Sequence, residues 1–143
     1  MKPIANSQLT GKWYNIARTH NFFEMNFVEI FLYILIACEN YLDLLYVGVK
    51  GDRNKVLKKL TLKILTKNDV NFIVIKKGIF KKTFRILTFD GKNGIFILSD
   101  RKMKYLSIFS RKPIMQHEVM ESYLNQIEEL NGKRIELYSN SIV

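Results

Sequence analysis

The sequence is poor in cysteine, histidine and proline, and each shortage excludes something. Its single cysteine, Cys38, excludes an intrachain disulfide and a cysteine-rich zinc module. The two histidines, His20 and His117, lie far apart in the sequence and show no metal-ligand spacing. Only two prolines interrupt 143 residues that are 48% hydrophobic, so we expect a folded chain rather than a disordered one. This length fits a single domain, residues 1–143, with ample apolar material for a core.

Long hydrophobic runs are also missing. The most apolar segment, residues 27–38, contains Glu29 and is much shorter than the ~20 residues of a membrane span. Residues 1–8 lack the apolar stretch of a secretory signal. We therefore expect no transmembrane segment. The compartment stays open, because a cytoplasmic protein and an exported protein without its signal look the same here.

Acidic residues are scarce in one part of the chain. Residues 50–85 contain twelve lysines and arginines but only two aspartates, whereas the rest of the chain holds eleven basic and eleven acidic residues. The formal net charge of +10 is therefore a local property. Such a segment makes nucleic acid, an anionic membrane or an anionic ligand candidate partners, and it says nothing about the fold.

Between residues 11 and 109, short apolar stretches alternate with polar or glycine-bearing breaks. The breaks fall at residues 21–26, 39–40, 51–54, 67–69, 77–78, 90–94 and 100–102. Evenly spaced segments rich in Ile, Val, Phe, Tyr and Leu predict an antiparallel meander, closed as a barrel or folded as a sandwich. The break Asp-Gly-Lys-Asn-Gly predicts a hairpin turn, because Asp-Gly and Asn-Gly supply the positive φ that such turns need.

Residues 55–67 show the clearest alternation. Four lysines share one parity, whereas Leu60, Leu62 and Ile64 share the other, so a strand would turn the lysines outward. These lysines are Lys55, Lys59, Lys63 and Lys67. Lysines four apart also fall on one face of a helix, so an amphipathic helix is the alternative. The β-rich neighbourhood favours the strand.

The pattern changes after Pro113. Apolar residues recur at spacings of three and four from Val119 to Leu130, with glutamates between them. Gly132 stands where a glycine commonly ends a helix. We therefore predict an all-β meander with one C-terminal amphipathic helix over residues 116–130, packed outside the strands, and a short final strand over residues 134–138.

Two segments resemble a known family. Residues 11–18 read Gly-Lys-Trp-Tyr-Asn-Ile-Ala-Arg and resemble the lipocalin signature Gly-x-Trp-Tyr-x-Ile-Ala-Arg. Residues 105–113, Tyr-Leu-Ser-Ile-Phe-Ser-Arg-Lys-Pro, are similar to the block Tyr-Leu-Trp-Ile-Leu-Ser-Arg-Thr-Pro of the bacterial and apolipoprotein D-like branch, which also has a Phe-Glu pair like Phe23-Glu24. Asp90 stands at the aspartate of the family's second motif. The resemblance implies an eight-stranded antiparallel up-and-down β-barrel with one helix outside it.

The resemblance also implies structural roles for Gly11, Trp13, Asp90 and Arg111. The Arg111 guanidinium would stack on the Trp13 indole and contribute about 0.5–2 kcal/mol. This pair would close one end of the barrel, so that the barrel opens at the other end only. Gly11 would allow a close backbone approach at the closed end.

An eight-stranded barrel has room for one small ligand, and every second residue lines its interior. On the last strand, an inward Arg111 implies that residues of the same parity also point inward. On the third strand, Asp43 should face water, so residues of the opposite parity point inward. On the second strand, we assign the inward face to the residues that share the parity of Glu29. The expected ligand-binding residues are Phe31, Tyr33, Leu42, Leu44, Tyr46, Tyr105, Ser107 and Phe109. Because Ser107 stands where this branch has tryptophan, the family's ligands do not transfer.

The expected function is the binding or transport of a small hydrophobic or amphipathic ligand, such as a fatty acid or lysophospholipid. Apolar burial would drive binding, with tyrosines and nearby lysines steering an anionic head group. We expect no enzyme, cofactor or metal, because no nucleophile–base arrangement or carboxylate pair is readable.

Two alternatives remain open. A basic β-module would bind an anionic membrane or nucleic acid through residues 50–85, with the membrane against Lys55, Lys59, Lys63 and Lys67. Nucleic acid is disfavoured, because that lysine face carries no aromatic residue for stacking. An isomerase acting through Cys38 is the other alternative, since the prostaglandin D synthases among lipocalins use a cysteine on the same strand; it requires Cys38 to face the cavity.

Overall fold

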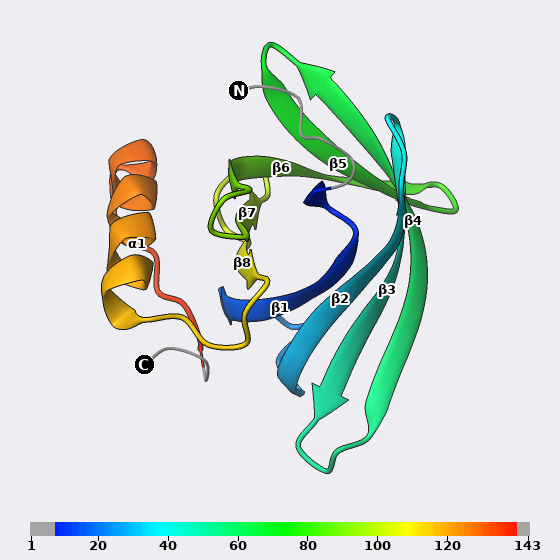
Figure 1. Ribbon diagram of the computed structural model, residues 1–143, viewed down its shortest axis with the longest axis horizontal. Helices are drawn as coiled ribbons and strands as arrows, with labels where there is room; N and C mark the ends of the chain where they lie inside the picture. Colours follow the sequence, from blue (N-terminus) through cyan, green and yellow to red (C-terminus); the bar gives the residue numbers. More distant parts are fainter. Residues whose placement is uncertain (1–7, 140–143) are drawn as a thin grey trace.

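The computed structural model describes residues 8–139 and shows eight antiparallel strands that close into a barrel in chain order, with β8 pairing back to β1 (Figure 1). The strands are β1 (Gly11–Arg18), β2 (Phe27–Ala37), β3 (Tyr41–Lys50), β4 (Lys55–Lys67), β5 (Val70–Lys77), β6 (Phe80–Asp90), β7 (Ile95–Ser99) and β8 (Leu106–Ser110). The predicted up-and-down barrel is confirmed.

Strand β4 has the bounds that the lysine–leucine alternation predicts. Lys59 and Lys63 are exposed on its outer face, whereas Leu62 is buried inside the barrel. One face of this strand is therefore exposed to solvent and the other lies inside the barrel. The alternative of an amphipathic helix over these residues is excluded. Strands β4, β5 and β6 pair in sequence, so the basic segment forms one continuous part of the barrel wall.

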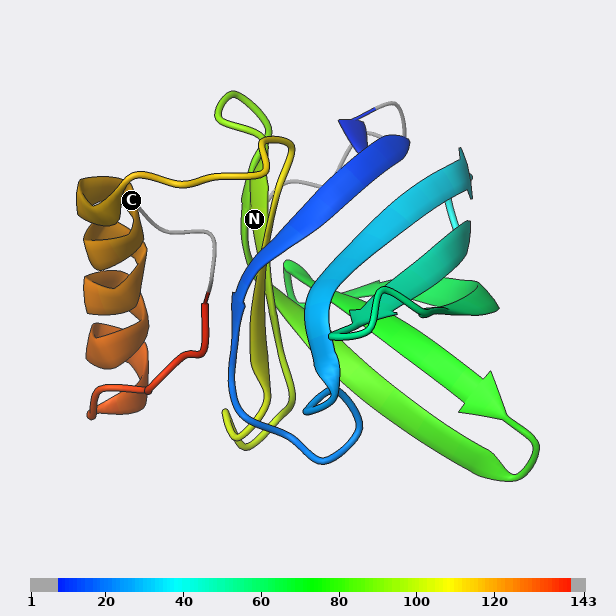
Figure 2. The same ribbon diagram turned by 90° about the horizontal axis from the view of Figure 1, so that it is seen from below.

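The barrel has two ends that differ in their connections. The loop end is formed by residues 19–26, 51–54, 78–79 and 100–105, which join β1–β2, β3–β4, β5–β6 and β7–β8. The turn end is formed by residues 38–40, 68–69 and 91–94, which join β2–β3, β4–β5 and β6–β7. In an up-and-down barrel, alternate connections share an end, and Figure 2 shows the β1–β2, β5–β6 and β7–β8 connections projecting together.

Helix α1 (His117–Asn131) covers the outer face of β1, β7 and β8 (Figures 1 and 2). Its buried residues Met120, Tyr123 and Ile127 pack in one cluster with residues of these strands. Val119 and Leu130, which the periodicity places on the apolar face, are exposed. Gly132 ends the helix at a φ of 80°, and its N–H donates to the carbonyl of Glu128 at 2.8 Å, as its position predicted.

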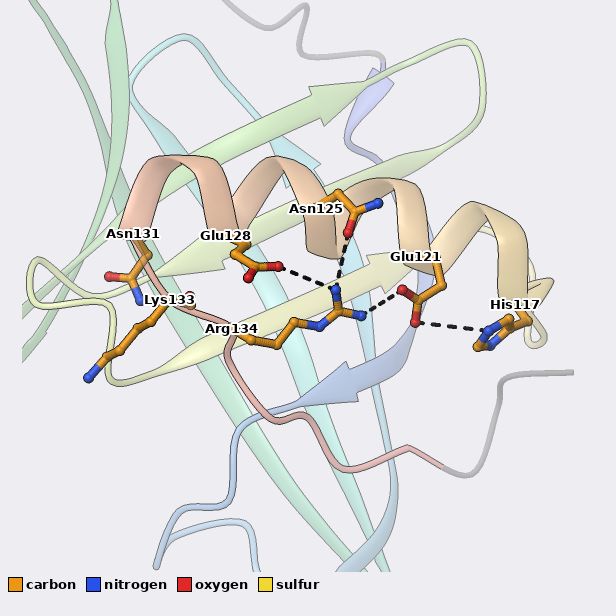
Figure 3. A network of polar contacts seen from close by, with 7 residues as sticks. All are labelled: His117, Glu121, Asn125, Glu128, Asn131, Lys133 and Arg134. Carbon is orange, nitrogen blue, oxygen red and sulfur yellow. Dashed lines mark hydrogen bonds and ion pairs between the residues drawn. The ribbon is translucent and has the colours of Figure 1, made fainter.

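The short final strand predicted over residues 134–138 forms only a single bridge, between Arg18 and Tyr138. Just after the helix, the side chain of Arg134 turns back onto it (Figure 3). Its guanidinium donates to Glu121 at 2.6 Å and to Glu128 at 3.4 Å. The chain is thus held against the helix at Arg134, and it reaches β1 at Tyr138 and at Ser139, whose hydroxyl donates to the carbonyl of Ile16.

Among the residues that the structure describes, no helix is long and apolar enough to cross a membrane.

Candidate functional site

A cavity of about 630 Å³ lies inside the barrel, in the half toward the turn end. Most of its wall is aliphatic and comes from the inward faces of β2 to β7. The apolar lining residues are Leu9, Leu32, Ile34, Leu42, Leu44, Leu62, Ile64, Leu65, Ile73, Ile86, Phe96 and Leu98. The cavity is therefore a container for an apolar group rather than a polar cleft.

Polar groups line the outer end of the cavity, between the β2–β3 and β4–β5 connections. Glu39, Asn40 and Thr66 are exposed there, and Asn71 is buried beneath them. The Thr66 hydroxyl donates to the side-chain oxygen of Asn71 at 2.7 Å. Among the described residues that line this cavity there is no lysine. A polar group of a ligand at this end would meet one carboxylate, two amides and a hydroxyl.

The predicted contact between Trp13 and Arg111 is confirmed. The guanidinium carbon of Arg111 lies 3.8 Å from the centre of the Trp13 ring, and Trp13 is fully buried. The indole N–H donates to the carbonyl of Leu9 at 2.8 Å, and Arg111 donates to the carbonyl of Lys12 at 3.1 Å. Stacking contributes about 0.5–2 kcal/mol here, and the hydrogen bonds tie the segment before β1 to the end of β8.

Two glycines leave room for the Arg111 side chain. Gly11 has a φ of +104°, and a Cβ built on it would lie 3.0 Å from a terminal nitrogen of Arg111. Gly94 has a φ of +65°, and its Cβ would lie 2.6 Å from Cγ of the same arginine. Both positions combine positive φ with close approach, so a larger residue is strained at either. The close approach expected at Gly11 is present.

The direction in which the barrel opens differs from the sequence-based expectation. The Trp13–Arg111 pair was expected to close its end and to leave the other end open. The cavity instead extends to the turn end, which is the end where β1 begins, between the β2–β3 and β4–β5 connections. The pair occupies one side of that end, beneath β1 and β8, and side chains fill the loop end.

Glu24 is the central residue among the side chains that occupy the loop end of the barrel. It belongs to the β1–β2 connection but is only 8% exposed. Its carboxylate accepts the Tyr46 hydroxyl at 2.6 Å and the Tyr105 hydroxyl at 3.2 Å, which joins the loop to β3 and to the start of β8. Burial, and then the negative charge of Glu24, raise the pKa of both tyrosines well above the ordinary value, so both hydroxyls stay protonated donors.

A second group of side chains lies beside Glu24. Buried Arg18 donates to the Asn15 side chain at 3.1 Å and to the carbonyl of Phe27 at 2.6 Å. Asn15 in turn donates to the Ser107 hydroxyl at 2.6 Å. The ring of Phe27 lies over Gly48, where any Cβ would come within 2.6 Å of it. We call the eight residues of the two groups the polar plug. They are Asn15, Arg18, Glu24, Phe27, Tyr46, Gly48, Tyr105 and Ser107.

The residues predicted to bind ligand fall into three groups. Leu42 and Leu44 line the cavity. Tyr46, Tyr105 and Ser107 have the polar partners described above and belong to the polar plug, so their hydroxyls are not available as polar handles within the cavity. Phe109 is buried inside the barrel and stacks on Phe96, a lining residue, with ring centres 4.9 Å apart.

Phe31 and Tyr33 form the third group, and their predicted inward orientation is wrong. Both rings lie on the outer face of β2, where the Lys12 ammonium is 4.6 Å from the centre of one and 5.4 Å from the other. Strand register is the reason. Trp13 pairs with Leu32 across β1 and β2, and directly paired residues share a face, so an inward Trp13 turns Leu32 inward.

The sequence contained one signal for this error. Glu29 shares the parity of Phe31 and Tyr33, and a charged side chain marks the outer face. Counting from Glu29 would have assigned Leu32 and Ile34 to the cavity. The other apolar lining residues that were not assigned to the ligand site lie before β1 and on β4 to β7; they are Leu9, Leu62, Ile64, Leu65, Ile73, Ile86, Phe96 and Leu98. The polar lining residues, also not assigned, are Glu39, Asn40, Thr66 and Asn71. No motif singles them out, because their role depends on register.

Asp90 acts at the turn between β6 and β7. Its carboxylate accepts the backbone N–H of Asn93 at 3.1 Å and the Asn93 side chain at 2.8 Å, which lowers the Asp90 pKa. It also accepts the Tyr123 hydroxyl from helix α1 at 3.2 Å. Burial and the Asp90 charge raise the pKa of Tyr123 to about 12. Asp90 therefore holds the hairpin and links it to the helix.

Cys38 follows β2 and is half-buried. It is not among the residues that line the cavity, and a hydrogen bond with this cysteine raises the pKa of Tyr41. The requirement of the isomerase alternative, a cavity-facing thiol, is not met. Among the described residues, no group of three or more His, Cys, Asp or Glu could hold a metal ion.

Comparison with solved structures shows barrels of the same architecture. The allergen Per a 4 from cockroaches aligns with a TM-score of 0.71 at 13% identity, over 98% of this chain and 89% of that one. Japanin from Rhipicephalus appendiculatus, bound to cholesterol, aligns with a TM-score of 0.62 at 16% identity, over 96% of this chain and 97% of that one. The amine binding protein of Rhodnius prolixus, in its tryptamine complex, aligns with a TM-score of 0.64 at 12% identity, over 97% of this chain and 82% of that one.

No protein-family model and no curated protein matches the sequence. The structural similarities do not support the bacterial branch expected from the motifs, and at identities of 12–16% they show the fold alone. The closed eight-stranded antiparallel barrel, the Trp13–Arg111 stack and the helix on β1, β7 and β8 together give this chain a lipocalin-like fold.

Proposed function

We propose that the protein binds one small hydrophobic or amphipathic ligand inside the barrel, in the cavity at the turn end. The observation that carries this proposal is the cavity itself, about 630 Å³ with aliphatic walls. Small-molecule sites typically measure about 300–1,000 Å³ and have mostly apolar walls with a few polar groups. Each Å² of ligand surface buried against such walls contributes about 25 cal/mol to binding.

The outer end of the cavity favours a ligand whose polar group is neutral or cationic. Glu39 places a negative charge there, beside the amides of Asn40 and Asn71. A hydroxyl, amine or amide can donate to these oxygens, whereas a carboxylate would be repelled by Glu39. This differs from the anionic head group expected from the sequence, because the lysines thought to steer it do not line the cavity.

Two of the structural neighbours are consistent with this ligand class. Japanin was solved bound to cholesterol, and the amine binding protein as a complex with tryptamine. Proteins of this fold thus bind a neutral sterol in one case and an amine in another. For the present chain we favour a long-chain alcohol, a sterol or a long-chain amine over a free fatty acid.

Native mass spectrometry of an untreated preparation tests for a copurified ligand directly. A titration should follow with three saturated ligands of one chain length, a primary alcohol, a primary amine and a carboxylic acid. We expect the alcohol and the amine to bind more tightly than the acid. Glu39→Gln should remove the difference between alcohol and acid, and Glu29→Gln, on the outside of β2, should not.

A pair of tryptophan variants locates the site. Leu44→Trp fills the cavity, whereas Leu57→Trp places the same ring on the exposed face of β4. We expect Leu44→Trp to weaken binding by at least about tenfold, equivalent to 1.4 kcal/mol, and Leu57→Trp to leave it unchanged. If Leu44→Trp does not fold, Leu62→Phe fills less of the space. Equal affinity in both variants, or no binding of any of the three ligands, would overturn the proposal.

A further inference from the structure

Large apolar side chains are exposed at two tips of the loop end. In the β1–β2 connection, Phe22, Phe23 and Met25 are 82%, 81% and 66% exposed. At the tip of the β5–β6 hairpin, Ile79 is 95% exposed and Phe80 is 76% exposed. Figure 2 shows both tips projecting from the same end of the barrel, the first in blue and the second in green. Gathered exposed apolar side chains mark a surface that contacts a partner or a membrane.

The exposure of Phe22 and Phe23 follows from the polar plug. Asn21 and Glu24 bond each other twice, through the Asn21 amide at 2.9 Å and the Glu24 backbone N–H at 3.0 Å. Glu24 is drawn into the barrel end by Tyr46. The loop is therefore fixed at both sides of the two phenylalanines, and they are left on its outer surface.

Cations surround these tips. In or within two residues of the four loop-end connections there are ten basic and three acidic residues. Around the three turn-end connections there are two basic and three acidic residues, and the start of β1 and the end of β8 add Lys12, Arg111 and Lys112 at that end. Those with exposed side chains at the loop end are Lys50, Arg53, Lys55, Lys76, Lys81, Arg101, Lys102 and Lys104. Of the three acidic residues, Glu24 is buried and Asp100 accepts two backbone N–H groups, so the exposed charge is strongly positive.

We propose that the loop end docks on an anionic lipid bilayer. Phe22, Phe23, Ile79 and Phe80 enter the boundary between head groups and acyl chains, and the surrounding lysines and arginines lie against anionic head groups. Apolar side chains ringed by cations are suited to this interface, because apolar burial and electrostatic attraction add there. Two separated tips also fix the orientation, which a single tip would not.

The arrangement favours a membrane over nucleic acid. Bases stack on aromatic platforms that follow a basic groove. Here Met25 and Ile79 offer no ring to stack on, and the aromatic residues stand on two separate tips. The docking surface shares only Lys55 with the four lysines expected from the sequence to face a membrane. Lys59 and Lys63 lie on the side of the barrel, and Lys67 lies at its turn end.

Vesicle flotation tests the proposal with two compositions, phosphatidylcholine alone and phosphatidylcholine with phosphatidylserine. We expect binding to the anionic vesicles that weakens with added salt, and little binding to the neutral ones. Ile79→Ser with Phe80→Ser should reduce binding to anionic vesicles at least about tenfold. Leu57→Ser with Leu130→Ser, on the barrel wall and the helix, is the matched control and should bind as the parent does.

Charge variants separate the two ends. Lys76→Gln with Lys81→Gln removes two loop-end charges and should weaken binding roughly fivefold for each lysine. Lys67→Gln with Lys92→Gln removes the same charge at the turn end and should have a much smaller effect. Equal losses from both pairs would mean that net charge alone drives binding, which would overturn the proposed surface. Tighter binding to an oligonucleotide than to anionic vesicles would overturn the choice of partner.

The orientation is tested with brominated lipids, which quench tryptophan on contact. Phe80→Trp should be quenched on anionic vesicles, and Leu130→Trp, on helix α1, should not. Quenching of the helix probe instead would show a different docking face. These outcomes do not depend on the cavity ligand, so the docking surface and the proposed function can fail separately.

Discussion

The two ends of the barrel close in opposite ways. At the loop end, Glu24 and two tyrosines make a hydrogen-bonded closure that leaves little space. At the turn end, Trp13 and Arg111 close only one side by stacking, and an apolar cavity occupies the rest. Polar closure demands that every buried group find a partner, so it is compact and specific. Apolar packing does not require such partners, and this difference explains why the cavity lies at the turn end.

Trp13→Ala should have the largest effect, because it removes the main packed residue of the turn end. The ring is fully buried and lies 4.6 Å from the ring of Phe96. We expect a loss of about 3–5 kcal/mol in the free energy of unfolding, measured by denaturant titration. Phe22→Ala, at an exposed site of the loop end, is the control and should change it little. A loss below about 1 kcal/mol would contradict the packing role.

Glu24→Ala should open the loop end. It leaves the hydroxyls of Tyr46 and Tyr105 without their acceptor, and hydrogen bonds to charged groups contribute about 1.5–3 kcal/mol each. We expect a loss of about 3 kcal/mol in unfolding free energy, the lower limit for two such bonds, with ligand affinity in the cavity unchanged. Glu29→Ala, on the outer face of β2, is the control. A large drop in ligand affinity would mean that the two ends are coupled.

Tyr46→Phe should alter the alkaline limit of stability. The pKa of Tyr46 is raised in the folded protein, first by burial and then by Glu24. Its contribution is fully present below the unfolded pKa of about 10, and it falls as the pH rises above that value, because only the unfolded chain releases the proton. Above that pH, each tyrosine of this kind makes the free energy of unfolding fall by about a further 1.4 kcal/mol per pH unit.

Denaturant midpoints measured between roughly pH 9 and 12 test this expectation. The parent should lose stability more steeply than Tyr46→Phe, because the variant has one tyrosine fewer whose pKa is raised by folding. Identical slopes would show that the Tyr46 hydroxyl titrates equally in both states, which would contradict its burial beside Glu24.

Arg134→Gln should have the smallest effect, since the Arg134 side chain lies along the exposed side of helix α1, where it pairs with Glu121 and Glu128 (Figure 3). The hydrogen bond from Arg134 lowers the pKa of Glu121. A lowered pKa contributes stability above the unfolded value of about 4.3 and loses it as the pH falls. The parent should therefore melt slightly higher than the variant at neutral pH, and the two should converge in acid. A constant difference would point to packing instead.

Elements with strong local patterns were predictable from the sequence. The lysine–leucine alternation defined β4 to the residue, and Asp90 to Gly94 form the predicted hairpin turn. The apolar residues at spacings of three and four, with glutamates between them, predicted both ends of the helix to within one residue. In each case the signal lies within the segment, and tertiary contacts reinforce it rather than override it.

The site was less predictable, because it depends on register and on a loop. The orientation of Phe31 and Tyr33 required the pairing of Leu32 with Trp13, which no residue pattern states. The plug required Glu24 to fold back into the barrel, and a loop glutamate carries no local sign of burial. The prediction of a final strand over residues 134–138 was wrong for a similar reason. The Arg134 side chain bonds to Glu121 on the helix, and this tertiary contact holds the segment there.

Strand β4 carries a consequence for amide exchange. Helix α1 and the aromatic residues inside the barrel cover both faces of β7 and β8, whereas β4 has the cavity on one face and exposed lysines on the other. A bound ligand would supply the missing half of the core for β4. Its backbone amides should therefore gain protection from hydrogen–deuterium exchange on ligand binding, while those of β7 and β8, already enclosed, should exchange slowly with or without it.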